Sequence, residues 1–180
     1  MADGAFLYTD SALDEELPQD ESFERMRFLL GRFERTASEF YSEYAANNDF
    51  FADEPIKKMS KLTNNLLHGI DYKRVKEVRE ENYRYLHKEL GSINLLRLSD
   101  HAGTFMYPLY LQNGPEIRKK LQNLHIYIPT LWPDVWKWCN KNETEFKMSE
   151  NILPLPCDQR YSQRDMKTVC DSIKGITADR

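Results

Sequence analysis

The sequence predicts an α+β protein, in which a helical N-terminal arm precedes a small mixed or antiparallel sheet with helices packed on one face. Three observations predict this class. Apolar residues recur at three- and four-residue steps through most of residues 1–91, which is the period of amphipathic helices. Short apolar runs alternate with helical stretches over residues 92–180. Helices that return over one face of a sheet satisfy that order. We therefore expect two parts, residues 1–91 and residues 92–180.

The first part is expected to be helical almost throughout. An apolar stripe predicts one amphipathic helix over residues 22–46, with Ser22 as its N-cap. Pro55 ends or redirects the chain after that helix. A shorter helix is expected next, and Asp71 is placed to cap a long helix that Gly91 stops.

The second part is expected to open with a hairpin. Two apolar runs, Ile93–Leu98 and Phe105–Leu111, flank the polar, turn-like stretch SDHAGT. Pro108 favours an edge position or a bulge in the second run, because proline cannot donate to a sheet. The remaining elements are expected as helix, strand, helix, strand and helix: Glu116–Asn123, His125–Ile128, a short helix from Asp134, Ile152–Pro156, and a last helix after Ser162.

The last helix carries a specific start signal. Ser162 and Asp165 stand at the spacing of a capping box, in which each side chain bonds the other residue's backbone N–H. The apolar positions of this helix recur at helical spacing, so one face is expected in the core: Met166, Val169, Cys170 and Ile173.

Composition excludes several classes of protein. The formal net charge of −4 argues against a nucleic-acid binder, which needs a clustered basic surface. No apolar stretch approaches the roughly 18 to 20 residues of a membrane span, and the acidic N-terminus lacks the pattern of a secretory signal. The three cysteines form no CxxC pair, which is typical of reduced thiols in a cytoplasmic protein.

Known catalytic and metal-binding patterns are also missing from the sequence. The four histidines do not pair at helical spacing, so the sequence predicts no metal site: His68, His87, His101 and His125. The chain has no GxSxG elbow, no Walker-type loop and no GxGxxG.

Two groups of residues are candidates for ligand contact. Three tryptophans lie within seven positions and close to Tyr127, where they either form a core wedge or line a pocket: Trp132, Trp136 and Trp138. Arg160 and Tyr161 follow the end of the last expected strand. A polar group in that position suits ligand contact, and it equally suits a local salt bridge with Asp158.

Two stretches of the second half resemble a known family. HIYIPTLWPDVW and ENILPLPCDQRYSQRDMKTVCDSI are similar to the C-terminal end of fold-type I aminotransferases, and the nearest group is the DegT/StrS-type sugar aminotransferases. The family's order of elements is matched at Ile126, Trp132, Pro133, Leu153–Pro156, Asp165 and Met166.

The resemblance continues upstream. SKLTNNLLHGIDYKRVKEVREENYRYLHKEL resembles the family's helix pair that joins the large domain to the small one, and the pattern is matched at Ile70, Asp71, Tyr72, Arg79, Asn82, Tyr83, Leu86 and Leu90. The opening DGAFLYTD resembles the segment shortly after the family's catalytic lysine. The resemblance thus spans almost the whole chain.

This resemblance implies a function. The complete enzyme would bind pyridoxal phosphate as a Schiff base on a lysine and move an amino group, typically from glutamate, to a keto-sugar nucleotide in polysaccharide biosynthesis. The lysine is expected upstream of Met1, so this chain alone is expected to be inactive and to hold no tightly bound cofactor. The full enzyme is expected to be a cytoplasmic homodimer that meets neither nucleic acid nor membrane.

The same resemblance assigns substrate-facing residues to the small domain: Tyr127, Trp132, Arg160 and Tyr161. Arg160 is placed to grip a carboxylate or a phosphate with two parallel hydrogen bonds. Many sugar aminotransferases have histidine or tyrosine where this chain has Trp132, so the substrate itself stays open.

Two functions from other classes compete with this one. The chain is alternatively a non-catalytic binding or scaffold module. A third hypothesis is a helical adaptor that binds a partner through residues 22–46, and an apolar face left exposed to solvent would favour it.

Overall fold

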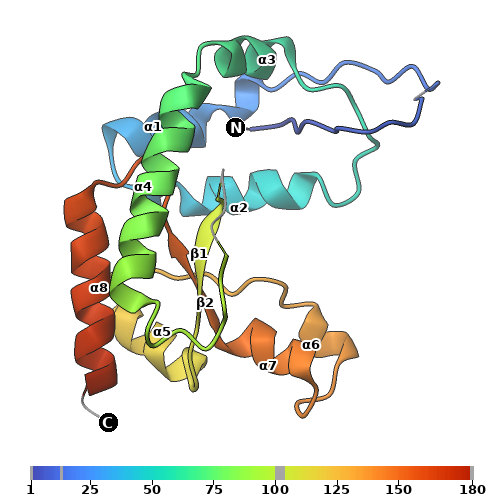
Figure 1. Ribbon diagram of the computed structural model, residues 1–180. Helices are drawn as coiled ribbons and strands as arrows, with labels where there is room; N and C mark the ends of the chain where they lie inside the picture. Colours follow the sequence, from blue (N-terminus) through green and yellow to red (C-terminus); the bar gives the residue numbers. More distant parts are fainter. Residues whose placement is uncertain (1, 13, 100–103, 179–180) are drawn as a thin grey trace. The chain divides into compact units, whose positions relative to one another are not determined.

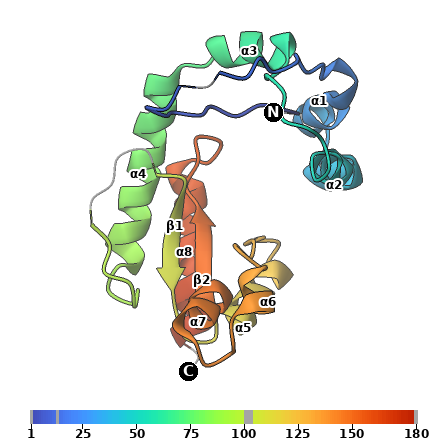
Figure 2. The same cartoon turned by 90° about the vertical axis from the view of Figure 1, so that its right-hand side faces the viewer.

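The chain divides into two units, Met1–Ile70 and Asp71–Arg180. The computed structural model describes residues 2–12, 14–99 and 104–178, and its fold class is α+β, as the sequence predicts. Helices and strands follow one another along the chain in this order (Figures 1 and 2): α1 (Arg27–Glu34), α2 (Tyr41–Phe50), α3 (Lys61–His68), α4 (Tyr72–Leu90), β1 (Met106–Tyr110), α5 (Gly114–Asn123), α6 (Val135–Trp138), α7 (Thr144–Asn151), β2 (Ile152–Pro156) and α8 (Gln163–Ala178).

The division between the units falls at residue 70, whereas the sequence changes character at residue 92. The difference comes from α4, which looks like the preceding helices in sequence but belongs to the second unit. Leu86 and Leu90 of α4 are fully buried in the core formed by the two strands and α8. Burial of these side chains therefore ties the helix to the sheet that follows it.

The long helix predicted over residues 22–46 is wrong, because the chain breaks between α1 and α2. Thr36 begins a new 3-10 turn, Ala37–Phe40, with its N–H and hydroxyl donating to the Glu39 carboxylate at 3.3 and 2.7 Å. A threonine followed three residues later by a glutamate is a start signal for a helix. This local signal interrupts an apolar stripe that otherwise continues.

A close contact fixes the bend between these helices. A Cβ atom at Gly31 of α1 would lie 2.2 Å from the ring of Phe40, so only glycine lets the ring lie against the α1 backbone. Phe40 is buried there. Ser22 does not cap a helix as predicted, because its hydroxyl lies 2.6 Å from the hydroxyl of Ser60 and makes no capping bond.

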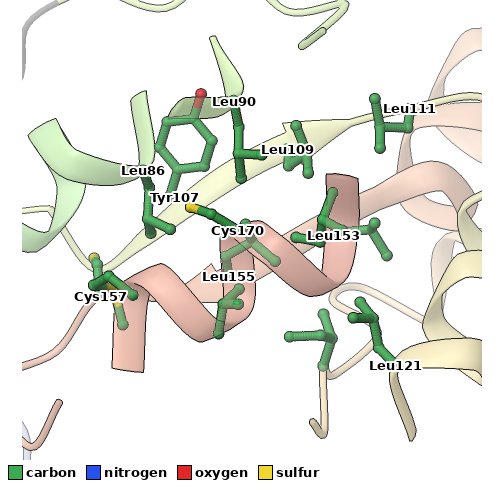
Figure 3. Packing of buried hydrophobic residues seen from close by; sticks show 14 of the residues in the cluster. Leu86, Leu90, Tyr107, Leu109, Leu111, Leu121, Leu153, Leu155, Cys157 and Cys170 are labelled. Carbon is green, nitrogen blue, oxygen red and sulfur yellow. The ribbon is translucent and has the colours of Figure 1, made fainter. Parts of the chain in front are cut away.

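The second unit is built on an antiparallel pair of strands. In the register of β1 and β2, Tyr107 lies opposite Leu155 and Leu109 lies opposite Leu153, and all four side chains are fully buried. Figure 3 shows them converging with leucines of α4 and with Cys170 of α8. The predicted buried face of the last helix is confirmed: Met166, Val169, Cys170 and Ile173.

The hairpin predicted between residues 93 and 111 is wrong, since β1 pairs with β2 instead. Residues 93–98 form turns and bends, and Asn94 and Leu95 bond the outer edge of β1, where the N–H of Leu95 donates to the carbonyl of Tyr110 at 3.0 Å. The Asn94 side chain donates to the carbonyl of Pro108 at 2.9 Å and accepts the N–H of Tyr110 at 3.0 Å. Pro108 has no N–H on this edge, which explains why no regular ladder forms. Residues 100–103, the core of the predicted turn, lie outside the described residues.

Pro108 also lies directly opposite Pro154 in the register. The carbonyl of Pro108 points away from β2, since it accepts a hydrogen bond from Asn94 on the outer edge. The two prolines therefore form a non-hydrogen-bonded pair, in which the backbone groups of each residue point away from the other strand. Each outer edge of the sheet therefore lacks an N–H at its centre, and neither edge presents a complete row of donors.

The strand predicted at His125–Ile128 is also wrong, and the segment instead ends α5. His125 adopts the left-handed backbone conformation, with φ of 60°, and Ile126 donates its N–H to the carbonyl of Leu121 at 2.9 Å. This is the closing bond of a helix C-terminus, where glycine is the usual residue. Ile128 is buried in the core, so the segment stays on the second unit without pairing as a strand.

Several local predictions are confirmed. The side chain of Asp71 accepts the N–H of Arg74 at 3.0 Å and caps α4, which ends at Gly91. β2 forms at Ile152–Pro156 as expected. The capping box of α8 is present, since Ser162 N–H lies 2.7 Å from a carboxylate oxygen of Asp165, whose own N–H donates to the Ser162 hydroxyl at 3.4 Å.

Two glycines of the second unit should respond oppositely to alanine. At Gly114 a Cβ would lie 2.5 Å from the backbone of Asn151, and at Gly175, inside α8, it would meet nothing within 4 Å. We expect Gly114→Ala to lower the free energy of unfolding by about 1–3 kcal/mol. Gly175→Ala should raise it by roughly 0.5–1 kcal/mol. Urea denaturation of both variants checks this, and equal effects would contradict the packing described at Gly114.

Candidate functional site

The loop between β2 and α8, residues 157–162, carries two of the candidate residues, Arg160 and Tyr161. We call it the β2 loop. It begins where β2 ends at Pro156 and stops where α8 begins at Gln163. A strand and a capped helix thus hold both of its ends, a placement common for ligand-binding residues on a rigid scaffold.

Asn82 of α4 holds the β2 loop from beneath. Its side-chain amide lies 3.3, 3.3 and 3.0 Å from the carbonyl oxygens of Cys157, Asp158 and Tyr161, and its own oxygen accepts from Gln163 at 3.3 Å. The residue is buried. One fully buried amide therefore satisfies backbone groups at both ends of the loop, which fixes the loop's shape.

Arg160 forms the local salt bridge that the sequence left open. Its Nε and Nη2 atoms donate to the two carboxylate oxygens of Asp158 at 2.8 and 2.9 Å. The Asp158 side chain is 12% exposed and that of Arg160 is 63% exposed. In the part of the chain that the structure describes, the pair engages Nε and Nη2 and leaves Nη1 for another acceptor. Ligand contact by Arg160 stays a prediction.

The charge of Asp158 is held in place by its neighbours. Burial raises the pKa of this carboxyl, but hydrogen bonds from the side chain and N–H of Arg160 and the positive charges of Arg160 and Arg79 outweigh it, so the pKa lies below its usual range. The hydrogen bond to Asp158 in turn raises the pKa of Arg160. The pair is therefore ionised at neutral pH.

Arg79 adds a second guanidinium beside the β2 loop. Its Nε donates to the side-chain oxygen of Gln159 at 3.1 Å, and its Nη1 donates to the carbonyl of Thr104 at 3.2 Å. Arg79 and Asn82 are three positions apart and so share one face of α4. The sequence pattern contains both residues but assigned them no role. Their shared face was the signal that could have placed them together.

Tyr127 and Tyr161 are brought together by the structure. They line a small hollow of about 270 Å³ at the first turns of α8, together with His125 and Asp165 and an apolar floor that includes Met166. The Arg160 guanidinium lies 5.6 Å from the centre of the Tyr161 ring. Three of the four predicted substrate-facing residues therefore lie in one neighbourhood, although Arg160 is not part of the hollow's lining.

Trp132 does not line this hollow. It is 62% exposed and has a φ of 53°, a left-handed backbone that is rare for a bulky residue. The Ser149 hydroxyl lies 3.0 and 3.1 Å from the carbonyls of Leu131 and Trp132 and holds this turn. The core-wedge interpretation of the tryptophans is wrong, because Trp132 and Trp138 are both exposed.

Neither a metal-binding cluster nor a membrane-spanning helix is present among the described residues. Residues 2–12, 14–99 and 104–178 contain no group of three or more His, Cys, Asp or Glu side chains arranged to hold a metal ion. In the same ranges, no helix combines the length and the apolar character needed to cross a bilayer. Burial raises the pKa of Cys170 to about 11, so this thiol is not a nucleophile at neutral pH.

Comparison of the chain with protein-family models, with curated proteins and with solved structures finds no match.

Replacing Asn82 should destabilise the second unit strongly. Asn82→Asp keeps the size of the side chain but turns its donor into an acceptor that faces three carbonyl oxygens. We expect the free energy of unfolding to fall by about 2–4 kcal/mol, because buried acceptors are left opposite each other. Asn123→Asp, on an exposed position of α5, is the control and should change it by less than about 0.5 kcal/mol. A similar loss in both variants would show that Asn82 does not hold the loop.

The Asp158–Arg160 pair should make stability depend on pH in one direction. Because the folded pKa of Asp158 is depressed, its contribution is complete above the unfolded pKa of about 3.9 and is lost as the pH falls through the folded pKa. Asp158→Asn should therefore cost about 1 kcal/mol at pH 7, a value limited by the exposure of Arg160. Urea denaturation of both proteins at falling pH should show the two stabilities converging once the pH lies below the folded pKa of Asp158. A constant difference down to that pH would contradict this account.

Proposed function

We propose that the chain is the C-terminal portion of a pyridoxal-phosphate-dependent aminotransferase of the DegT/StrS type. One observation supports the proposal most. The stretches that carry the resemblance are far apart in sequence, yet their residues meet at the β2 loop. Asn82 of the upstream stretch binds backbone carbonyls on both sides of Arg160, and it accepts a hydrogen bond from Gln163 of α8. A family pattern that encodes one site is expected to converge in this way.

The residues of this chain would bind and orient a substrate. The site offers two guanidinium groups, those of Arg79 and Arg160. The carboxylate of Asp158 accepts a hydrogen bond from Arg160 and is also attracted by the positive charge of Arg79. The side chain of Gln159 accepts a hydrogen bond from Arg79. This donor set fits a carboxylate or a phosphate, which accepts paired hydrogen bonds from arginine. Arg160 would turn its Nη1 edge to the ligand while Asp158 keeps the guanidinium oriented.

The catalytic lysine belongs, in this proposal, to a domain encoded before Met1. Pyridoxal phosphate bound there supplies the electrophile that receives the amino group. The substrates are an amino donor such as glutamate and a keto-sugar nucleotide of polysaccharide biosynthesis. The full enzyme is proposed to be a homodimer in the cytoplasm, and the chain alone is proposed to be inactive.

A non-catalytic binding module remains the second candidate. The exposed apolar side chains of the first unit favour it, since α1 and α2 leave large residues in solvent: Leu30, Phe33 and Tyr41. An adaptor would use this surface to bind a partner. The same surface would be covered by the large domain or by the second subunit in the enzyme, so its exposure supports both candidates.

Absorbance spectroscopy separates the two candidates. If the chain is part of an aminotransferase, the full-length protein should show the visible absorbance band of lysine-bound pyridoxal phosphate, and an amino donor should deplete it. The isolated chain of 180 residues should show no specific band with added cofactor. A full-length protein that binds no pyridoxal phosphate would remove the enzyme proposal and leave the binding module.

Arg160 should contribute to substrate binding in the full-length enzyme. Arg160→Lys removes the planar fork and keeps the charge, so we expect KM for one substrate to rise by roughly tenfold with a smaller change in kcat. Arg164→Lys, on an exposed position of α8, is the matched control and should leave KM unchanged. Steady-state kinetics with each substrate varied in turn measure the effect. Equal KM values in both variants would leave Arg160 as a purely structural partner of Asp158.

A further inference from the structure

The outward side of α1 carries a short apolar patch between two opposite charges. Leu30 and Phe33 are 66% and 91% exposed, and Arg27 and Glu34, the first and last residues of the helix, are exposed as well. Residues at three-, four- and seven-residue steps share one side of a helix. The four side chains therefore form one surface, which we call the outer face of α1.

The outer face is held in place by the opposite side of the same helix. The Phe28 ring packs edge-on against the ring of Tyr44 in α2, with the ring centres 5.9 Å apart. The backbone at Gly31 lies against the buried ring of Phe40. Figure 2 shows α1 and α2 packed side by side. Because these contacts fix the rotation of α1, its apolar patch stays on the surface of the first unit.

The charges of the outer face are placed against the dipole of their own helix. A helix favours acidic residues at its start and basic residues at its end, and Arg27 at the start and Glu34 at the end reverse this preference. Arg27 has a partner in Glu43 of α2, 3.0 Å away, but its side chain stays 78% exposed. Across residues 2–12, 14–99 and 104–178, Glu34 has no ion pair. The arrangement disfavours α1 within one chain, so its benefit is expected in a contact with another molecule.

A second copy of α1, laid antiparallel, supplies what each end of the outer face lacks. Around a two-fold axis beside Leu30, Arg27 of one copy meets Glu34 of the other, and the same pair forms a second time. Each charge then also lies beside the end of the partner helix whose dipole attracts it. The apolar patches of the two copies cover each other between the charge pairs. We propose that the outer face of α1 is the contact surface of a two-fold symmetric dimer of this chain.

The order of the residues favours a second copy over an unrelated partner. A contact around a two-fold axis must be complementary to itself, and the outer face meets this condition because its two end charges have opposite signs. The contact involves one helix of eight residues, so it is small, and we expect a Kd of roughly 10–300 µM. The dimer needs only this chain and therefore does not depend on the aminotransferase proposal.

Sedimentation velocity of the 180-residue chain over a range of concentrations tests the dimer. Arg27→Glu and Glu34→Arg each turn two attractions into two repulsions, so each variant alone should dimerise roughly tenfold more weakly. An equimolar mixture of the two variants should dimerise again, because opposite charges meet in both pairs of the mixed dimer. Both substitutions agree with the helix dipole, so α1 stays folded in each variant.

The controls separate this contact from general effects of charge. Both variants keep a negative net charge, since each changes the formal charge of −4 by two, so a general attraction between them does not explain recovery in the mixture. Glu81→Arg and Lys141→Glu, on exposed positions of the second unit, make the same changes in charge and should leave the dimer intact. Phe33→Ser should weaken the dimer at least about tenfold, because apolar contact is lost in both copies.

Each outcome decides for or against the dimer. A chain that stays monomeric up to about 1 mM overturns the inference. A dimer that survives Phe33→Ser and both charge reversals lies on another surface and also overturns it. Weakening by each reversal without recovery in the mixture rules out the antiparallel pairing. Recovery in the mixture, with unchanged dimers in the two controls, supports it.

Discussion

Burial of one face of the β1–β2 pair is the constraint on which the second unit depends. A two-stranded sheet is marginally stable at best in water, and here four directly opposed side chains, Tyr107, Leu155, Leu109 and Leu153, are fully removed from solvent. Each such side chain contributes roughly 1.5–3 kcal/mol on burial. Helices α4 and α8 supply the apolar surface that makes this burial possible. The sheet and these two helices therefore stabilise each other.

The same packing also fixes the shape of the candidate site. β2 delivers the β2 loop at its carboxyl end, and α4, held by Leu86 and Leu90 in the core, places Asn82 beneath that loop. The residues of α4 that pack in the core and the residues that bind the β2 loop lie only a few positions apart along the helix. A shift of α4 against the sheet would therefore move Arg79 and Asn82 together and would change the orientation of Arg160 through its pairing with Asp158.

The sequence predicted those features that depend on local chemistry. The cap at Asp71, the capping box at Ser162 and the strand at residues 152–156 all form as expected, since each is decided within a few residues. Features decided at a distance were missed. The partner of β1 lies more than 40 residues away in β2 rather than in the nearby run. The break at Thr36 was missed for a different reason, since its start signal is local but the apolar stripe that continues past it favours one helix.

The same distinction holds at the candidate site. That Arg160 follows a strand end was visible in the sequence, and its salt bridge with Asp158 was one of two stated alternatives. That a buried asparagine from another helix would hold the loop was not visible, because hydrogen bonds across about 75 residues leave no local pattern. The exposure of Trp132 was equally hidden, since three neighbouring tryptophans suit a core and a surface alike.

The facing prolines of the sheet also have a consequence for synthesis of the protein. β2 leaves the ribosome roughly 45 residues after β1, which at about 5–20 residues per second is a delay of several seconds. During that time β1 is an apolar strand without its partner. Pro108 removes one main-chain donor from the outer edge of β1, the edge against which Asn94 lies, whereas the edge that waits for β2 keeps its donors at Tyr107 and Leu109. The residue that prevents a regular hairpin thus makes only one edge of the half-made sheet unsuited to pairing with another chain, and the other edge stays open until β2 is made.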